Sequence, residues 1–157
     1  MKFEQYKFLK KSLLEKAHIG KGQAAGQPSP LVWAYLGDAL YALYVRKNLV
    51  REENNKVRVL NDVSAKLVSA VVQAKSVDFL SDCLTAEEKD IVRRGRNTKS
   101  SVPKSASVDE YRKSTGFECL LGWLHYKGQE ERLEDLMGRA LRFSLEYLKT
   151  GEADNES

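Results

Sequence analysis

The feature that most constrains the fold is an apolar run, LVWAYLGDALYALYV, at residues 31–45. Fourteen of its fifteen residues are apolar, aromatic or glycine, and the fifteenth is Asp38. Ser29 can cap a helix and Pro30 suits the first helical position, so we expect a long helix from Pro30 to about Leu49. Asp38 would then be a single carboxylate in an otherwise apolar helix, and it requires a physical explanation.

The rest of the chain also has a helical pattern, because prolines occur only at positions 28, 30 and 103 and apolar residues recur at helical spacing. We expect helices over residues 3–16, 57–75 and 130–149, and a short one ending near Cys83. The capping-box sequence TAEE opens a helix at 85–88, and another carries YRKSTGFECLLGWLHY and stops near Gly128. Residues 97–108 are polar and predict a loop. Nothing predicts a sheet, so the fold class is all-α.

Length and composition indicate one folded domain. The chain has 157 residues, of which 42% are hydrophobic and 31% charged. It has no apolar run near the roughly 20 residues of a membrane span, and its N-terminus lacks a signal-peptide core. Cys83 and Cys119 suggest buried thiols in a reducing compartment, so we expect a cytoplasmic protein without a disulfide framework or zinc site. We expect a single domain over 1–150 and a disordered acidic tail over 151–157.

Positive charge is concentrated in one segment. Residues 89–113 contain eight Lys and Arg against three acids, a surplus of five, whereas the whole chain carries a net charge of only +4. The remainder is therefore close to neutral. A locally basic segment indicates an anionic partner, of which nucleic acid is the commonest.

Two acidic residues in apolar helices are candidate metal ligands. Asp38 has no basic neighbour along its helix, and Glu118, eighty residues later, is followed by Leu121 and Gly122 on the same face. A buried unpaired carboxylate must be protonated, hydrogen-bonded, partly hydrated or bound to a cation. If the two helices pack so that the acids meet, Mg²⁺ or Mn²⁺ would relieve their repulsion. Gly37 and Gly122 would permit close approach there. The alternative is that each acid is a hydrogen-bonded structural residue.

The basic segment supplies candidate RNA-binding residues. Their guanidinium and ammonium groups suit phosphate oxygens, and they are Arg93, Arg94, Arg96, Lys99, Lys104, Arg112 and Lys113. The alternative is a solvated helix end whose arginines complement the helix dipole.

These residues resemble a known family. AYLGDAL, at residues 34–40, resembles the signature helix of the ribonuclease III catalytic domain, in which an acid precedes Leu-Gly-Asp. TGFECLLGWLHY, at 115–126, is similar to that family's second acidic helix. RRGRN, VPK and YRKSTGFE resemble the short subclass called Mini-ribonuclease III, a catalytic domain without a double-stranded-RNA-binding domain. The resemblance covers about residues 30–149 and implies the helical bundle of the ribonuclease III endonuclease domain.

The chain departs from the full family at two positions. The family usually has two further acids, one four residues before the aspartate and one three before the glutamate, where this chain has Ala34 and Thr115. The resemblance implies that Asp38 and Glu118 are the catalytic residues and hold Mg²⁺, for which Mn²⁺ can substitute. Water and RNA oxygens would complete the coordination shell. His125 is expected to be structural.

The resemblance implies a metal-dependent endoribonuclease that hydrolyses double-stranded RNA and leaves 5′-phosphate and 3′-hydroxyl ends. Because a duplex has two strands, a twofold homodimer is expected. Trp33, Tyr41 and Tyr44 are candidate interface residues, with the intramolecular core as an equal alternative. The family further implies maturation of large-subunit ribosomal RNA precursors, and it leaves open a ribosomal protein at the substrate as a partner.

Two other functions compete. One is a non-catalytic module that binds double-stranded RNA and retains the fold, for which Ala34 and Thr115 are the warning signs. The other is a helical adaptor that binds a protein through its aromatic helix. Replacing Asp38 by Asn separates enzyme from module, and a steep salt dependence of RNA binding argues against the adaptor.

Overall fold

The computed structural model describes residues 2–15, 26–98, 101–102 and 104–155. Its helices, in chain order, are α1 (Lys2–Glu15), α2 (Pro30–Glu52), α3 (Val57–Leu67), α4 (Ala70–Leu80), the 3₁₀ helix η1 (Ser81–Cys83), α5 (Ala86–Arg96), α6 (Val108–Tyr126) and α7 (Glu130–Asn155). The described part contains no strand, so the all-α prediction is confirmed. No helix within these ranges is both long and apolar enough to cross a membrane.

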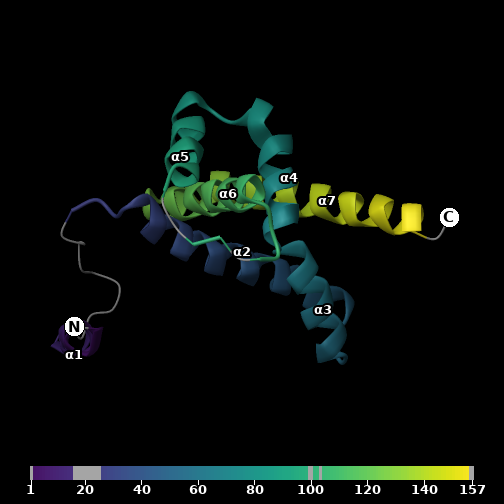
Figure 1. The fold of residues 1–157 in the computed structure, drawn as a ribbon. Helices are drawn as coiled ribbons and strands as arrows, with labels where there is room; N and C mark the ends of the chain where they lie inside the picture. The colour runs from purple at the N-terminus through teal and green to yellow at the C-terminus, as the bar shows by residue number, and fades with distance from the viewer. Residues whose placement is uncertain (1, 16–25, 99–100, 103, 156–157) are drawn as a thin grey trace.

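Helix α6 lies at the centre of the bundle (Figure 1). Helices α4 and α5 stand on one side of it, α2 lies on the other, and α7 runs alongside. The sequence explains this position, because FECLLGWL is apolar on nearly every face and such a helix must be covered all round. Phe117, Leu120, Leu121 and Leu124 are fully buried. Each such side chain contributes about 1.5–3 kcal/mol when it leaves water.

The helix ends follow local signals. Ser29 caps α2, with Pro30 in the first turn, and Thr85 and Glu88 form the predicted capping box of α5. A second capping box, formed by Ser107 and Glu110, opens α6. After α6 the chain turns at Gly128, whose φ of +72° lies in the left-handed region that glycine tolerates. Helix α7 continues beyond the predicted end to Asn155, while the state of the tail stays a prediction.

Two predictions, one about a helix and one about the burial of a cysteine, were wrong. The single helix expected over 57–75 is two helices, because Ser69 adopts an extended conformation and its hydroxyl accepts from the Val72 N–H at 3.4 Å. This cap starts α4 in a new direction, although the apolar stripe continues across the break. Cys83 is exposed rather than buried, whereas Cys119 is buried as expected.

Candidate functional site

Helices α2 and α6 cross in backbone contact at two glycines. A Cβ atom placed on Gly37 would lie 1.8 Å from the Glu118 carbonyl oxygen, and one on Gly122 would lie 1.9 Å from the Trp33 carbonyl oxygen. Any side chain at either position would therefore force the helices apart. The predicted role of these glycines in close approach is confirmed, and the crossing brings the two acidic positions together.

The carboxyl groups of Asp38 and Glu118 lie near each other at this crossing. Glu118 is half-buried, and its pKa is raised to about 8, first by burial and then by the negative charge of Asp38. Asp38 itself is exposed, so partial hydration, one of the four states expected for it, applies in this structure. The residues that α2 buries, among them Trp33, Gly37 and Tyr41, lie on a different face of the helix from Asp38.

Among the described residues, no Lys or Arg forms an ion pair with Asp38 or Glu118. Within the described ranges, no third His, Cys, Asp or Glu side chain joins these two acids to form a larger group of potential metal ligands. The side chain of Gln73, from α4, also lies beside Glu118, and it lowers the Glu118 pKa against the two larger effects of burial and Asp38.

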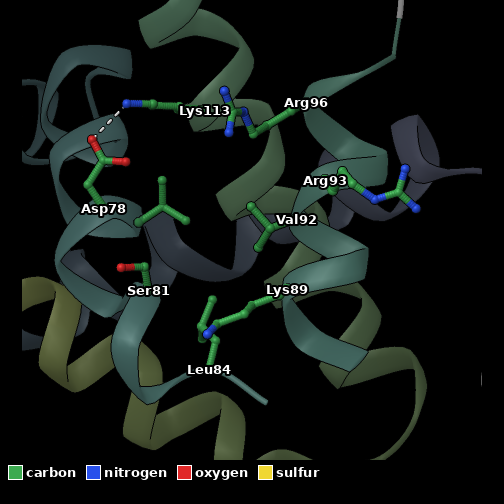
Figure 2. Close-up of a pocket in the computed structure, with 9 residues that line it drawn as sticks. Asp78, Ser81, Leu84, Lys89, Val92, Arg93, Arg96 and Lys113 are labelled. Atoms are coloured by element: carbon green, nitrogen blue, oxygen red, sulfur yellow. Dashed lines mark hydrogen bonds and ion pairs between the residues drawn. The ribbon is translucent and has the colours of Figure 1, made fainter. Parts of the chain in front are cut away.

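A basic cleft opens between α4, α5 and α6, with a volume of about 200 Å³ (Figure 2). A second pair of glycines holds α5 against α6, since a Cβ on Gly95 would lie 2.9 Å from the Cα of Gly116. Val77, Leu84 and Val92 form the apolar part of the wall, and Lys89, Arg93, Arg96 and Lys113 supply the positive charge. Figure 2 shows Arg96 and Lys113 at one end of the opening, with the Lys113 ammonium directed at Asp78, while the Arg93 guanidinium turns away from the opening.

Acidic side chains already hold most of these cations. Lys113 Nζ lies 2.8 Å from Asp78 and 3.3 Å from Asp109, and the hydrogen bond to Asp78 is the main cause of its raised pKa. Arg96 lies 3.5 Å from Asp109. Among the described residues, Lys89 forms no ion pair, so it is the cleft's unneutralised charge.

The predicted RNA-binding residues divide into three groups. Arg96 and Lys113 face the cleft, and Arg93 lies at its rim in a pair with Asp90. Arg94 is half-buried, with its guanidinium 5.4 Å from the centre of the Trp33 ring, so it packs against α2. Lys104 and Arg112 are exposed outside the cleft, and Lys99 lies outside the described residues.

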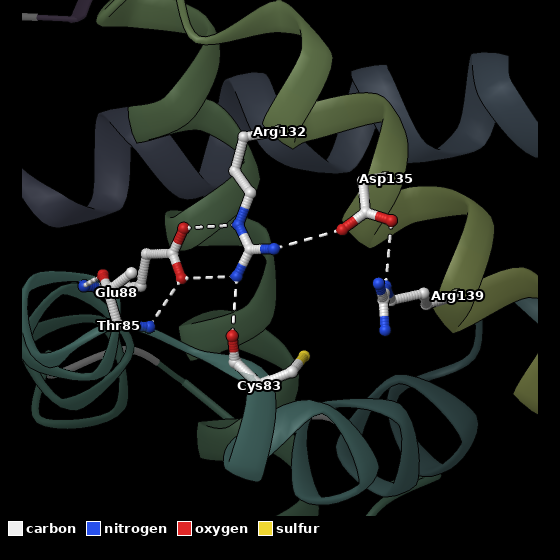
Figure 3. Close-up of polar contacts among 6 residues, drawn as sticks. All are labelled: Cys83, Thr85, Glu88, Arg132, Asp135 and Arg139. Atoms are coloured by element: carbon white, nitrogen blue, oxygen red, sulfur yellow. Dashed lines mark hydrogen bonds and ion pairs between the residues drawn. The ribbon is translucent and has the colours of Figure 1, made fainter.

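A buried ion pair fixes the start of α5 to α7 (Figure 3). Glu88 is 3% exposed, and its carboxylate accepts from the Thr85 N–H and from Arg132 Nε, each at 2.8 Å. Arg132 also donates to the Cys83 carbonyl oxygen at 2.7 Å and to Asp135 at 3.1 Å. The hydrogen bond from Arg132 is the main reason that the pKa of Glu88 is lowered. The network holds α5, and with it the basic cleft, in place.

The remaining candidates have structural surroundings. Trp33 and Tyr41 are each 1% exposed, so they belong to the core, which was the alternative left open for them. Tyr44 is half-buried and packs against that core. His125 Nδ1 lies 2.7 Å from Glu130, and this contact links the end of α6 to the start of α7.

Comparisons with known proteins give the family. The sequence model of the Ribonuclease III domain matches residues 31–129. Mini-ribonuclease 3 of Thermoanaerobacter is 50% identical over 110 residues, which cover 69% of this chain and 78% of that protein. Mini-ribonuclease 3 of Enterococcus faecalis is 39% identical over 133 residues, covering 83% of this chain and 96% of the relative. The chain belongs to the ribonuclease III family, in its Mini-ribonuclease 3 group.

A solved structure agrees with this membership. A crystal structure of a Fusobacterium nucleatum protein superposes with a TM-score of 0.69 at 27% identity, covering 77% of this chain and 98% of that one. As a member of the ribonuclease III family, the protein is an endoribonuclease that acts on double-stranded RNA. The family depends on divalent metal ions and functions as a dimer.

The acid pair fits a hard divalent ion. Two carboxylates of like charge, one of them largely removed from water, form a site that a cation would stabilise more than any neutral ligand. The two positions where the family usually has further acids cannot contribute. Ala34 is 5% exposed, and Thr115 is 6% exposed with its hydroxyl donating to the Tyr111 carbonyl oxygen at 3.0 Å. Water and substrate oxygens would therefore complete the shell, as Mg²⁺ accepts.

Sequence reasoning missed three contributors to the site: Lys89, Gln73 and the pair of Glu88 with Arg132. Lys89 stands four residues before Arg93 on α5, so helical spacing alone could have placed it beside the other cations. Nothing local marks Gln73 or Arg132, because their partners lie 44 to 45 residues away along the chain.

Proposed function

We propose that this protein hydrolyses double-stranded RNA with Mg²⁺ held by Asp38 and Glu118. The observation that carries the proposal is the meeting of two otherwise unpaired carboxylates at the α2–α6 crossing, next to the helices that line a basic cleft. The bound ion would lower the pKa of a water molecule and stabilise charge on the scissile phosphate. Mn²⁺ has the same preference for oxygen ligands and could replace it.

The chain's own residues would prepare the site. Glu118, whose pKa is raised to about 8, would hold a proton at neutral pH in the absence of a cation and would release it to solvent when the ion binds. The glycine crossing holds the two carboxylates in a fixed relation, so they need little rearrangement on binding. His125 takes no part, since its contact with Glu130 is on another part of α6.

RNA binding is assigned to the basic cleft and to the exposed cations around it. Lys89, Arg96 and Lys113 would contact phosphate oxygens, with Arg93 at the rim and Lys104 and Arg112 as exposed contributors. Lys99 retains its predicted role. Because acidic side chains compete for Arg96 and Lys113, each phosphate contact replaces an existing ion pair and adds only modestly to affinity.

A homodimer would bring two acid pairs to the two strands. Helix α2 exposes a run of apolar side chains that includes Val32, Tyr35 and Leu43, which are 53%, 83% and 57% exposed. These three replace Trp33 and Tyr41 as interface candidates, because a buried side chain has no area left to offer a partner. A contact along α2 about a twofold axis would be self-complementary.

The proposed substrate is precursor ribosomal RNA of the large subunit, in the cytoplasm, with a ribosomal protein as a candidate partner at the substrate. The support is the similarity to Mini-ribonuclease 3 proteins over most of the chain. No residue of the cleft encodes this choice. Cleavage of large-subunit precursor RNA compared with an unrelated duplex, with and without total ribosomal proteins, would test it.

The deciding experiment is cleavage of a long double-stranded RNA by the wild type and by Asp38→Asn, each with Mg²⁺ and with EDTA. We expect cutting only by the wild type with Mg²⁺, while the variant still binds the duplex. Binding by both proteins without cutting by either would favour the non-catalytic module. Cutting by Asp38→Asn at the wild-type rate would remove Asp38 from the site.

A further inference from the structure

Gln73 is a buried polar residue with no role in the mechanism described above. It lies in the first turn of α4, where its backbone N–H donates to the Ser69 carbonyl oxygen at 2.9 Å. Its side chain is only 1% exposed. Neither the nitrogen nor the oxygen of its amide forms a hydrogen bond with any described residue. A fully buried amide with both polar atoms unsatisfied is rare in a folded protein.

The position of this amide relates it to the acid pair. Helix α4 packs on α6, and the Gln73 side chain lies beside the Glu118 carboxyl group, which has Asp38 as its other polar neighbour. The amide is close enough to favour the ionised carboxylate but is outside ordinary hydrogen-bond geometry. The Asp38 carboxyl group of α2 and the neutral Gln73 amide of α4 thus both lie beside the Glu118 carboxyl group.

Other buried polar groups nearby do not satisfy Gln73. The Ser76 hydroxyl, one turn along α4, donates to the Val72 carbonyl oxygen at 2.9 Å and contacts the Ser144 hydroxyl at 3.1 Å. These groups have partners of their own. An unsatisfied buried amide costs roughly 1–3 kcal/mol, and a methionine of similar volume would avoid that cost. The glutamine is therefore best explained by a hydrogen bond that forms in another state of the site.

We propose that Gln73 is a positioning residue for the metal site, whose amide N–H donates to the Glu118 carboxylate when a divalent cation joins Glu118 to Asp38. The inference rests on the proposed function, because it requires the cation. A carboxylate that binds a metal ion through one oxygen leaves lone pairs of the other oxygen free, and a hydrogen-bond donor at that oxygen restricts the rotation of the group. A neutral amide provides this donor without changing the charge of the pair.

The test is Mn²⁺ affinity of the full chain, measured from the free-ion signal in electron paramagnetic resonance, together with the melting temperature. Gln73→Met should weaken Mn²⁺ binding about tenfold, the lower end of the effect of removing a partner of a metal ligand. Its melting temperature without metal should be unchanged or higher. Gln73→Glu, which adds a third carboxylate beside Glu118, should bind Mn²⁺ more tightly. RNA cleavage by Gln73→Met should recover as Mn²⁺ is raised.

Tyr41→Phe is the matched control, since the Tyr41 hydroxyl is also buried without a hydrogen-bond partner in the described part but lies near Ser144 instead of the acids. It should leave Mn²⁺ affinity unchanged. Glu118→Gln serves as the second reference. If Glu118→Gln abolishes Mn²⁺ binding while both Gln73 variants bind like the wild type, the role of Gln73 is overturned and the metal site stands. If Glu118→Gln also binds Mn²⁺ normally, the proposed metal site itself fails.

Discussion

The α2–α6 crossing and the basic cleft treat charge in opposite ways. At the crossing, the carboxyl groups of Asp38 and Glu118 repel each other when both are ionised, and no Lys or Arg among the described residues forms an ion pair with either. In the cleft, Asp78 and Asp109 already pair with Lys113, and Asp109 also pairs with Arg96. The crossing is therefore electrostatically incomplete without a ligand, whereas the cleft is nearly satisfied. The proposed function assigns a tightly held ion to the first region and exchangeable phosphate contacts to the second.

The largest expected loss of stability comes from adding a methyl group at the α2–α6 crossing. Gly122→Ala should destabilise the fold by about 3 kcal/mol or more, because the new Cβ would lie 1.9 Å from the Trp33 backbone and no rotamer change can relieve that overlap. Urea unfolding followed by circular dichroism measures the loss. Gly151→Ala, whose Cβ meets nothing within 4 Å, is the control and should have little effect. Equal stability of Gly122→Ala and the wild type would contradict the backbone contact.

The buried ion pair of Glu88 with Arg132, which fixes the helix that carries the cleft cations, should contribute strongly to stability. Glu88→Gln leaves Arg132 without its charged partner and should destabilise the protein by about 2–3 kcal/mol at pH 7. The pKa of Glu88 is lowered in the folded state, so its contribution is present above its ordinary pKa and is lost as pH falls through the folded value. The stability gap between wild type and variant should therefore narrow below about pH 4. A gap that persists unchanged to pH 2.5 would contradict this account.

Neutralising the acid pair should stabilise the protein. Because the folded-state pKa of Glu118 is raised to about 8, the wild type loses stability as pH rises between its ordinary value near 4.5 and 8. Without divalent ions, Glu118→Gln should be more stable than the wild type at pH 8.5 by something on the order of 1–3 kcal/mol, with little difference at pH 4.5. Thermal unfolding in EDTA at both pH values measures this. A variant that is less stable at pH 8.5 would mean that the Glu118 carboxylate has a stabilising partner.

The smallest expected effect concerns a single cleft charge. Lys89→Gln should weaken binding of a duplex RNA about two- to fivefold and reduce the slope of log affinity against log salt by about one. Electrophoretic mobility shifts in Ca²⁺ at several salt concentrations measure both quantities. Lys149→Gln, an equal charge change at the far end of α7, should alter neither. Equal effects of the two substitutions on affinity and salt slope would show that a cleft charge contributes no more to RNA binding than a charge outside the cleft.

Local signals account for the parts of the fold that the sequence predicted well. Two helix starts are marked by signals no longer than four residues: Ser29 with Pro30, and the capping box of Thr85 and Glu88. The sequence did not predict the break before α4, because the capping residue Ser69 lies inside a continuous apolar stripe. For the site, Asp38 and Glu118 were identified and do meet, while their metal-binding role stays a prediction. Arg94 was grouped with the other arginines because sequence spacing does not say which of them packs on Trp33.

By itself, the sequence determined the helical class, the apolar second half of α6 and the identity of the two lone acids, since periodicity and composition act within one helix. Only the tertiary structure decided the rest. The distance of Glu118 from Asp38, the unsatisfied amide of Gln73 and the clamp of Glu88 on Arg132 each depend on how helices far apart in the chain cross. Those crossings follow from backbone contacts at glycines and from the packing of many side chains together, and no short stretch of sequence contains them.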